Sequence, residues 1–200
     1  IIERCDTSNY KALSSIINKY KPNYIYHTAA LPLAKVSNLN NEEAKISSVD
    51  STVNIIDAIN LLKNSNQKYQ FDRFVYFSSS MVYGDFKKMK VTEDHPTNPK
   101  EIYGTAKLAG EILCKGLCKF YNIDYSIVRP SAVYGPTDMN NRVSQLIVDK
   151  ALNNETIEIY GKDEKLDFTY VKNLSLGFVK VATNKKGVNE IFNITNGKAH

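Results

Sequence analysis

Two periods of apolar residues alternate along the chain. Stretches in which apolar side chains recur every three or four residues predict amphipathic helices, and the first three occupy residues 8–21, 46–62 and 103–121. Ser8 is the expected N-cap of the first helix, and Pro22 follows its end. Between the helices lie continuous apolar runs that predict strands buried on both faces, at residues 24–27, 74–77 and 125–128. The alternation predicts an α/β fold in which helices cover both faces of a parallel sheet.

After Gly135 and Pro136 the pattern becomes less regular. Shorter elements are expected here: helices at 143–152 and around 178–181, and strand-like runs at 157–160, 168–171 and 191–194. We therefore expect a first domain over residues 1–136. Residues 137–200 would begin a smaller α/β lobe that is interleaved with the last elements of the first domain.

The composition narrows the class of protein. At 42% hydrophobic and 24% charged residues, the 200-residue chain is typical of a globular domain, and it has no apolar run long enough for a membrane span. The net charge of +5 comes from scattered Lys residues without a dense basic block, which disfavours nucleic acid as a partner. Three cysteines indicate no disulfide scaffold and suit a reducing, cytoplasmic compartment. Cys114 and Cys118 are expected to be buried thiols, and no metal site is predicted.

A tyrosine and a lysine four residues apart form the first candidate for chemistry. On a helix, Tyr103 and Lys107 lie on one face, where the ammonium lowers the pKa of the phenol and prepares it to act as a base. Chance alone supplies about 1.4 such pairs in a chain of this composition, and Tyr83 with Lys87 is a second one. Tyr83 precedes the turn residue Gly84, whereas Tyr103 opens a long helix, so the context favours Tyr103.

Three serines, Ser78 to Ser80, follow the predicted strand at 74–77. The carboxyl ends of parallel strands are where open α/β sheets build their sites. A hydroxyl there can bond a substrate oxygen and share a proton with the phenol of Tyr103. The alternative is a serine-rich turn that caps the next segment.

Together with these residues, several further motifs resemble the extended short-chain dehydrogenase/reductase family, and within it the NAD-dependent nucleotide-sugar epimerase/dehydratase branch. The resemblance covers nearly the whole chain and implies a Rossmann-like, doubly wound parallel sheet. Its motifs, in chain order, are HTAA at 27–30, SVDSTVN at 48–54, FSSSMVYG at 77–84, YGTAK at 103–107, VRPSAVYGP at 128–136, DFTYV at 167–171 and FNI at 192–194.

The resemblance implies a role for each matching position. Tyr103 would be the general acid/base, Lys107 would hold the nicotinamide ribose, and Ser79 would be the catalytic serine, with Ser80 as the alternative. The other residues expected to bind the NAD cofactor are Asp6 at the adenine, Ala29 and Ala30 at the ribose and phosphates, Ser78, and the backbone near Pro130. The residues expected to bind substrate are Ser80, Tyr83, Ala132 and Arg142, although Arg142 could equally be a solvated helix residue.

The chain also departs from the family pattern. No G-x-x-G-x-x-G phosphate loop occurs, and Ile1 to Asp6 resemble the end of the family's third strand, so we expect a fragment that lacks the first strands. Leu166 stands where relatives often carry a phosphate-binding Arg, and Lys165 could replace that Arg only as a point charge. Ser80 and Met81 stand where the family's dehydratases carry an Asp-Glu pair, which disfavours loss of water.

The resulting hypothesis is an NAD-dependent epimerase that oxidises and re-reduces one carbon of a nucleotide sugar, acting as a homodimer. Three alternatives stay open: an NAD(P)-dependent sugar dehydrogenase or reductase of the same family, a non-catalytic cofactor-binding protein, and a truncated chain that is inactive by itself. NADP is not excluded, because that choice is normally set at the end of the second strand, which is missing here.

Overall fold

The computed structural model describes residues 1–31, 40–88, 90–138, 142–158 and 165–199. The helices in these ranges are α1 (Tyr10–Tyr20), α3 (Asn41–Lys45), α4 (Ser51–Ser65), α5 (Ile102–Tyr121), α6 (Val143–Leu152) and α7 (Val171–Thr183). Three shorter helical segments are η1 (Ile46–Asp50), η2 (Ser80–Tyr83) and η3 (Lys185–Gly187). The strands are β1 (Tyr24–His27), β2 (Arg73–Phe77), β3 (Tyr125–Pro130), β4 (Val133–Tyr134), β5 (Thr169–Tyr170) and β6 (Glu190–Ile194).

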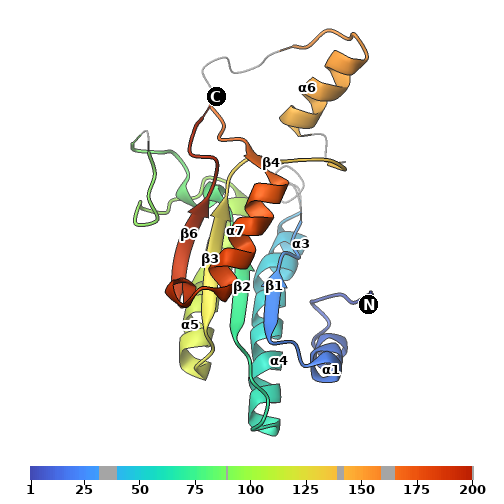
Figure 1. Cartoon of the computed structure of the whole chain (residues 1–200), viewed down its shortest axis with the longest axis vertical. Coiled ribbons are helices and arrows are strands. Elements are labelled where there is room, and N and C mark those ends of the chain that lie inside the picture. Colours follow the sequence, from blue (N-terminus) through green and yellow to red (C-terminus); the bar gives the residue numbers. More distant parts are fainter. Residues whose placement is uncertain (32–39, 89, 139–141, 159–164, 200) are drawn as a thin grey trace.

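A parallel sheet with the strand order β1-β2-β3-β6 forms the centre of the fold (Figure 1). All carboxyl ends of its strands therefore meet at one edge, which we call the carboxyl edge. A second, two-stranded parallel sheet joins β4 to β5 beyond that edge. The predicted α/β fold with a parallel sheet is confirmed.

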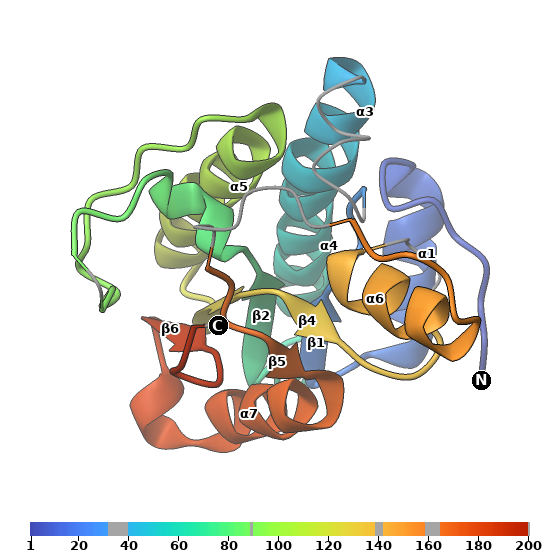
Figure 2. The same ribbon diagram turned by 90° about the horizontal axis from the view of Figure 1, so that it is seen from above.

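Side chains of the central strands alternate between two cores. Phe74 and Tyr76 of β2 pack with residues of α1, α4 and α5 on one face of the sheet. Val75 of the same strand packs on the opposite face, against Leu174 and Phe178 of α7. Figure 2 shows α7 on one side of the sheet, and α4 and α5 on the other. This two-sided burial is the reason for the continuous apolar run in the sequence.

Three local predictions are wrong. Asn9 caps α1 in place of Ser8, because the Asn9 side chain accepts a hydrogen bond from the backbone N–H of Ala12, while Ser8 donates its own N–H to Asp6. β1 is only half-buried, since it lies at the end of the strand order. In α5 the large apolar side chains of the predicted amphipathic helix at 103–121 are not the fully buried ones. Its buried residues are Gly104, Ala106, Lys107, Gly110, Glu111, Cys114 and Cys118.

The part after residue 136 is only partly regular. The predicted helix at 143–152 and the strand at 191–194 are confirmed as α6 and β6. The strand-like run at 157–160 has no strand at 157–158, and its remaining residues lie outside the described ranges. β6 returns to the central sheet, whereas α6 lies apart from it beyond the carboxyl edge (Figure 1). The division into two lobes at residue 136 stays a prediction.

Candidate active site

The three predicted catalytic residues gather at the carboxyl edge, from two elements. Ser79 follows the end of β2, and Tyr103 and Lys107 lie in the first turns of α5. The Ser79 hydroxyl accepts a hydrogen bond of 3.1 Å from the backbone N–H of Met81 and so caps the short helix η2. The same hydroxyl lowers the pKa of the Tyr103 phenol. Ser79 and Tyr103 therefore lie near each other at the carboxyl edge.

Burial raises the pKa of the Tyr103 phenol above its ordinary value of 10.0. Two neighbours act in the opposite direction, because the positive charge of Arg142 and the Ser79 hydroxyl both lower this pKa. A phenol that is to accept a proton near neutral pH needs such stabilisation of its anion. The structure thus brings the charge of Arg142 near Tyr103, a position that its place in the sequence does not reveal.

Lys107 lies below the tyrosine with its ammonium inside the protein. Its Nζ donates a 2.7 Å hydrogen bond to the carbonyl oxygen of Phe77 and lies 5.9 Å from the centroid of the Tyr103 ring. Burial lowers the pKa of Lys107 to about 8. An ammonium carries three donors, and within the described residues the structure gives it this one acceptor. The remaining donors suit the hydroxyls of a ligand.

Two glycines let α5 approach this edge closely. A Cβ on Gly104 would lie 2.6 Å from the carbonyl oxygen of Met81, and one on Gly110 would lie 2.1 Å from the hydroxyl of Tyr76. Real Cβ atoms do not approach other heavy atoms so closely. The tight packing of α5 on η2 and β2 thus sets the distance from Tyr103 to Ser79.

The predicted cofactor residues differ in their burial and in their contacts. Ala29 and Ala30 follow β1 at the carboxyl edge, and Pro130 ends β3 beside Ile194 of β6. Asp6 is exposed and accepts a hydrogen bond from the backbone N–H of Ser8. Ser78 is buried, and its hydroxyl donates to Glu111, so only its backbone could face a cofactor.

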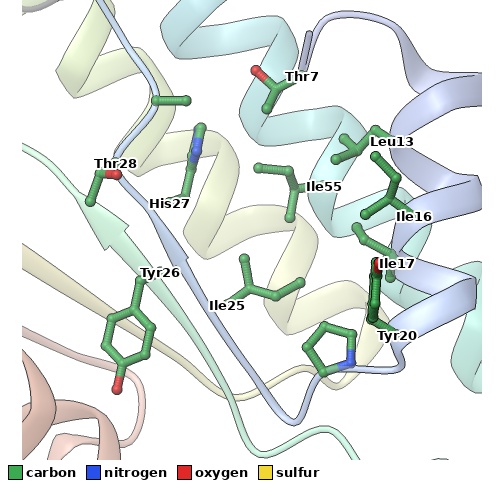
Figure 3. A pocket seen from close by; sticks show the side chains of 12 residues that line it. Thr7, Leu13, Ile16, Ile17, Tyr20, Ile25, Tyr26, His27, Thr28 and Ile55 are labelled. Atoms are coloured by element: carbon green, nitrogen blue, oxygen red, sulfur yellow. The ribbon is translucent and has the colours of Figure 1, made fainter. Parts of the chain in front are cut away.

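A cavity of about 270 Å³ opens between α1 and β1. Thr7, His27 and Thr28 line its end near the carboxyl edge, and Tyr20 lines the opposite end (Figure 3). Its other walls are mainly aliphatic, including Ile25. This volume lies at the lower limit of ligand pockets, and the apolar walls do not suit phosphate groups.

The donors at the carboxyl edge fit one part of a dinucleotide. Tyr103 and the partly unpaired ammonium of Lys107 suit a nicotinamide ribose. For the pyrophosphate, the sequence contains no glycine-rich loop whose backbone N–H groups could bind it. The described residues therefore fit the nicotinamide end of the cofactor.

The four predicted substrate residues separate into two groups. Ser80 begins η2 beside Ser79, and Ala132 lies between β3 and β4 near the carboxyl edge. Arg142 donates to the carbonyl oxygen of Val133 at 3.1 Å. Tyr83, by contrast, is buried, and its hydroxyl donates to Asn193 and accepts from Arg129. The structure assigns Tyr83 to the interior instead of the predicted substrate wall.

Two buried polar groups lie near the site, and sequence reasoning missed one of them, Glu111. Glu111 forms a salt bridge of 2.6 Å with Arg129 behind the catalytic residues. His27 hydrogen-bonds Ser51 and Thr52, and burial followed by the charge of Lys107 lowers its pKa to about 3. A signal for Glu111 existed, because it follows Lys107 by four residues and so shares its helix face.

Two features are absent from the described part of the chain. No helix there combines the length and hydropathy needed to cross a membrane. Within the same ranges, no three His, Cys, Asp or Glu side chains gather closely enough to hold a metal ion. The predicted burial of Cys114 and Cys118 is confirmed.

Comparisons with known proteins agree with these observations. The model of the NAD dependent epimerase/dehydratase family matches residues 1–195. The "Putative UDP-glucose 4-epimerase" of Methanocaldococcus jannaschii is 37% identical over 154 residues, which are 74% of this chain and 49% of that protein. The UDP-glucuronate 4-epimerase of Thermodesulfobacterium geofontis is 27% identical over 199 residues, covering 96% of this chain and 57% of its own. The chain thus spans about half the length of the curated relatives it matches.

A solved structure shows the same arrangement. The UDP-glucuronic acid 4-epimerase from Bacillus cereus, in complex with UDP-glucuronic acid and NAD, superposes with a TM-score of 0.85 at 28% identity, over 98% of this chain and 60% of that one. The UDP-glucose 4-epimerase from Thermotoga maritima, with a TM-score of 0.89 at 22% identity over 99% of this chain and 63% of that one, shows the same Rossmann-like fold. By its motifs, its fold and the family match over almost its whole length, the chain belongs to the NAD-dependent epimerase/dehydratase family.

Proposed function

We propose that the full-length protein is an NAD-dependent epimerase that inverts one carbon of a nucleotide sugar. The gathering of Ser79, Tyr103 and the Lys107 ammonium at the carboxyl edge carries the proposal. The names of the relatives support the substrate class, since the proteins from Thermodesulfobacterium geofontis and Bacillus cereus are both named as 4-epimerases of UDP sugars.

In this proposal the three residues move and hold one proton. Tyr103 accepts the proton of a sugar hydroxyl and later returns it. Ser79 hydrogen-bonds the same sugar oxygen, and Lys107 favours the phenolate by its charge and orients the ribose. NAD, when bound, supplies the acceptor and donor of hydride at that carbon. Arg142 adds a second positive charge near Tyr103, and in this proposal it binds a substrate phosphate.

The residues after Ser79 favour epimerisation over dehydration. Elimination of water needs an additional acid and base beside the sugar. Ser80 and Met81 begin η2 at this place, and neither carries a carboxylate. The small side chain of Ala132 leaves space for the sugar to turn between its oxidation and its reduction.

The test is the balance of cofactor and product during turnover of UDP-glucose and UDP-glucuronic acid by the full-length protein. We expect a new epimer of unchanged mass, with no net change in the NADH absorbance at 340 nm. Accumulation of NADH in proportion to product would replace the proposal with a dehydrogenase. A product 18 daltons lighter would show a dehydratase and contradict both.

A further inference from the structure

A buried ion pair lies directly behind the catalytic residues. Glu111 of α5 is 0% exposed, and Arg129 of β3 binds both of its carboxylate oxygens, through Nε at 2.8 Å and through Nη2 at 2.6 Å. A buried pair of this kind is weak evidence for stability, because removing two charges from water offsets most of their attraction. The location of the pair next to the segment that carries Ser79 points to a role other than stability.

The carboxylate of this pair holds the residue before Ser79. The Ser78 hydroxyl donates a 2.5 Å hydrogen bond to Oε1 of Glu111. The backbone N–H of Ser78 donates to the carbonyl oxygen of Val128 at 2.8 Å, so both groups of this serine are fixed. Phe77, whose carbonyl oxygen binds Lys107, is the next residue back along the chain.

The guanidinium of the same pair holds the segment after Ser79. Nη1 of Arg129 donates to the hydroxyl of Tyr83 at 2.9 Å, and that hydroxyl donates to Asn193 of β6 at 2.7 Å. Tyr83 is the last residue of η2, the short helix that Ser79 caps. The ion pair therefore fixes the chain on both sides of Ser79. Glu111 binds Ser78 on one side, and Arg129 binds Tyr83 on the other.

We propose that the Glu111–Arg129 pair is a positioning device that fixes the backbone on both sides of Ser79 and so sets the place of the Ser79 hydroxyl near Tyr103, with Ser78 and Tyr83 as its two contacts to this segment. This inference rests on the proposed function for its consequence in turnover. The geometric part concerns only residues of this chain and can be tested without a substrate.

The decisive variant is Ser78→Ala, because it releases one contact and leaves the ion pair intact. Ser126→Ala is a matched control. Ser126 is also 0% exposed, donates to the carbonyl oxygen of Gly187 at 2.6 Å and accepts from Arg73 at 2.9 Å, but it lies at the amino end of β3. The two substitutions remove the same group from comparable surroundings, and only one of them adjoins Ser79.

The first readout is the titration of Tyr103 by NMR in protein labelled with ¹³C at the tyrosine Cζ, with the signal assigned by Tyr103→Phe. Because the Ser79 hydroxyl lowers the pKa of Tyr103, we expect a higher pKa in Ser78→Ala and no change in Ser126→Ala. An equal pKa in the two variants would overturn the inference, whether or not the protein turns over a nucleotide sugar.

The second readout is kinetic. A small misplacement of a reacting group costs up to about 100-fold in rate, so we expect kcat to fall roughly 10- to 100-fold in Ser78→Ala. The KM for the nucleotide sugar should stay within about twofold, because positioning acts on the reaction step rather than on substrate binding. Loss of kcat in both serine variants alike would indicate a general structural effect and contradict the proposal.

If Ser78→Ala does not fold, Tyr83→Phe releases the other contact and keeps the ring. We expect the same rise in the pKa of Tyr103 and a smaller loss of kcat, because the Glu111 contact to Ser78 remains. An unchanged pKa there would refute the role of Arg129. Should the wild-type protein epimerise no nucleotide sugar, the proposed function fails while the titration still decides the positioning role.

Discussion

The Lys107 ammonium and the carbonyl oxygen of Phe77 lie 2.7 Å apart and join the first turns of α5 to the end of β2. This contact places a cation 2% exposed to solvent beneath the carboxyl edge, where burial lowers its pKa to about 8. The charge is retained at neutral pH, and it is held where the end of β2 and the first turns of α5 meet.

Tyr103→Phe removes the proton-transferring oxygen and keeps the ring. In the full-length protein we expect turnover to fall by at least the roughly 10²- to 10⁴-fold that a general acid/base contributes, with the NAD affinity unchanged. Steady-state kinetics measures turnover, and calorimetry measures the NAD affinity. Tyr83→Phe is the control, because its hydroxyl bonds Arg129 and Asn193 in the interior. A larger loss of activity in that control would reverse the assignment of the general base.

Arg142→Gln should move the pH dependence of kcat/KM. The charge of Arg142 lowers the pKa of Tyr103, so its removal raises this pKa further. Because the phenolate is the form that accepts the sugar proton, the rising limb of the profile should shift to higher pH. Arg4→Gln removes the same charge from the exposed amino-terminal segment and should leave the limb in place. Coinciding profiles of Arg142→Gln and the wild type would show that this charge does not act on Tyr103.

His27 should make the protein sensitive to mild acid. Its pKa is about 3 in the folded protein, below the ordinary 6.5, so the unfolded chain takes up a proton first as the pH falls. Between pH 6.5 and 5 this linkage lowers the free energy of unfolding by about 2 kcal/mol.

Urea unfolding at several pH values tests that linkage. The variant His27→Gln cannot take up this proton and should show a flatter pH dependence over the same interval. Thr52→Val removes a hydrogen-bond partner of the ring but keeps the histidine, so the slope should persist there. Parallel curves for His27→Gln and the wild type would contradict the expectation.

Gly110→Ala and Gly116→Ala should change stability in opposite directions. A Cβ at Gly110 would meet the hydroxyl of Tyr76 at 2.1 Å and the carbonyl oxygen of Ser48 at 3.1 Å, so we expect a loss of about 1–3 kcal/mol. At Gly116 a Cβ has open space, and the better helix former should gain about 0.5–1 kcal/mol. Chemical denaturation measures the free energy of unfolding of both variants. A gain in stability at both positions would show that α5 is not packed as described.

The sequence by itself determined the architecture and that Tyr103 and Lys107 share one helix face. A strand covered on both faces must be apolar along its whole length, so residues 74–77 could be read as a central strand. Helical spacing alone places Tyr103 and Lys107 on one face. Both inferences concern residues that are neighbours along the chain, where local geometry decides the outcome.

Only the tertiary structure decided what each serine contacts and what lies behind these contacts. Ser78 donates its hydroxyl to Glu111, whereas the Ser79 hydroxyl accepts from the N–H of Met81 and lies near Tyr103. Glu111 meets Arg129 across 18 residues, and Tyr83 meets Asn193 across 110. Such contacts depend on how elements pack in space, and no periodicity in the chain encodes that packing.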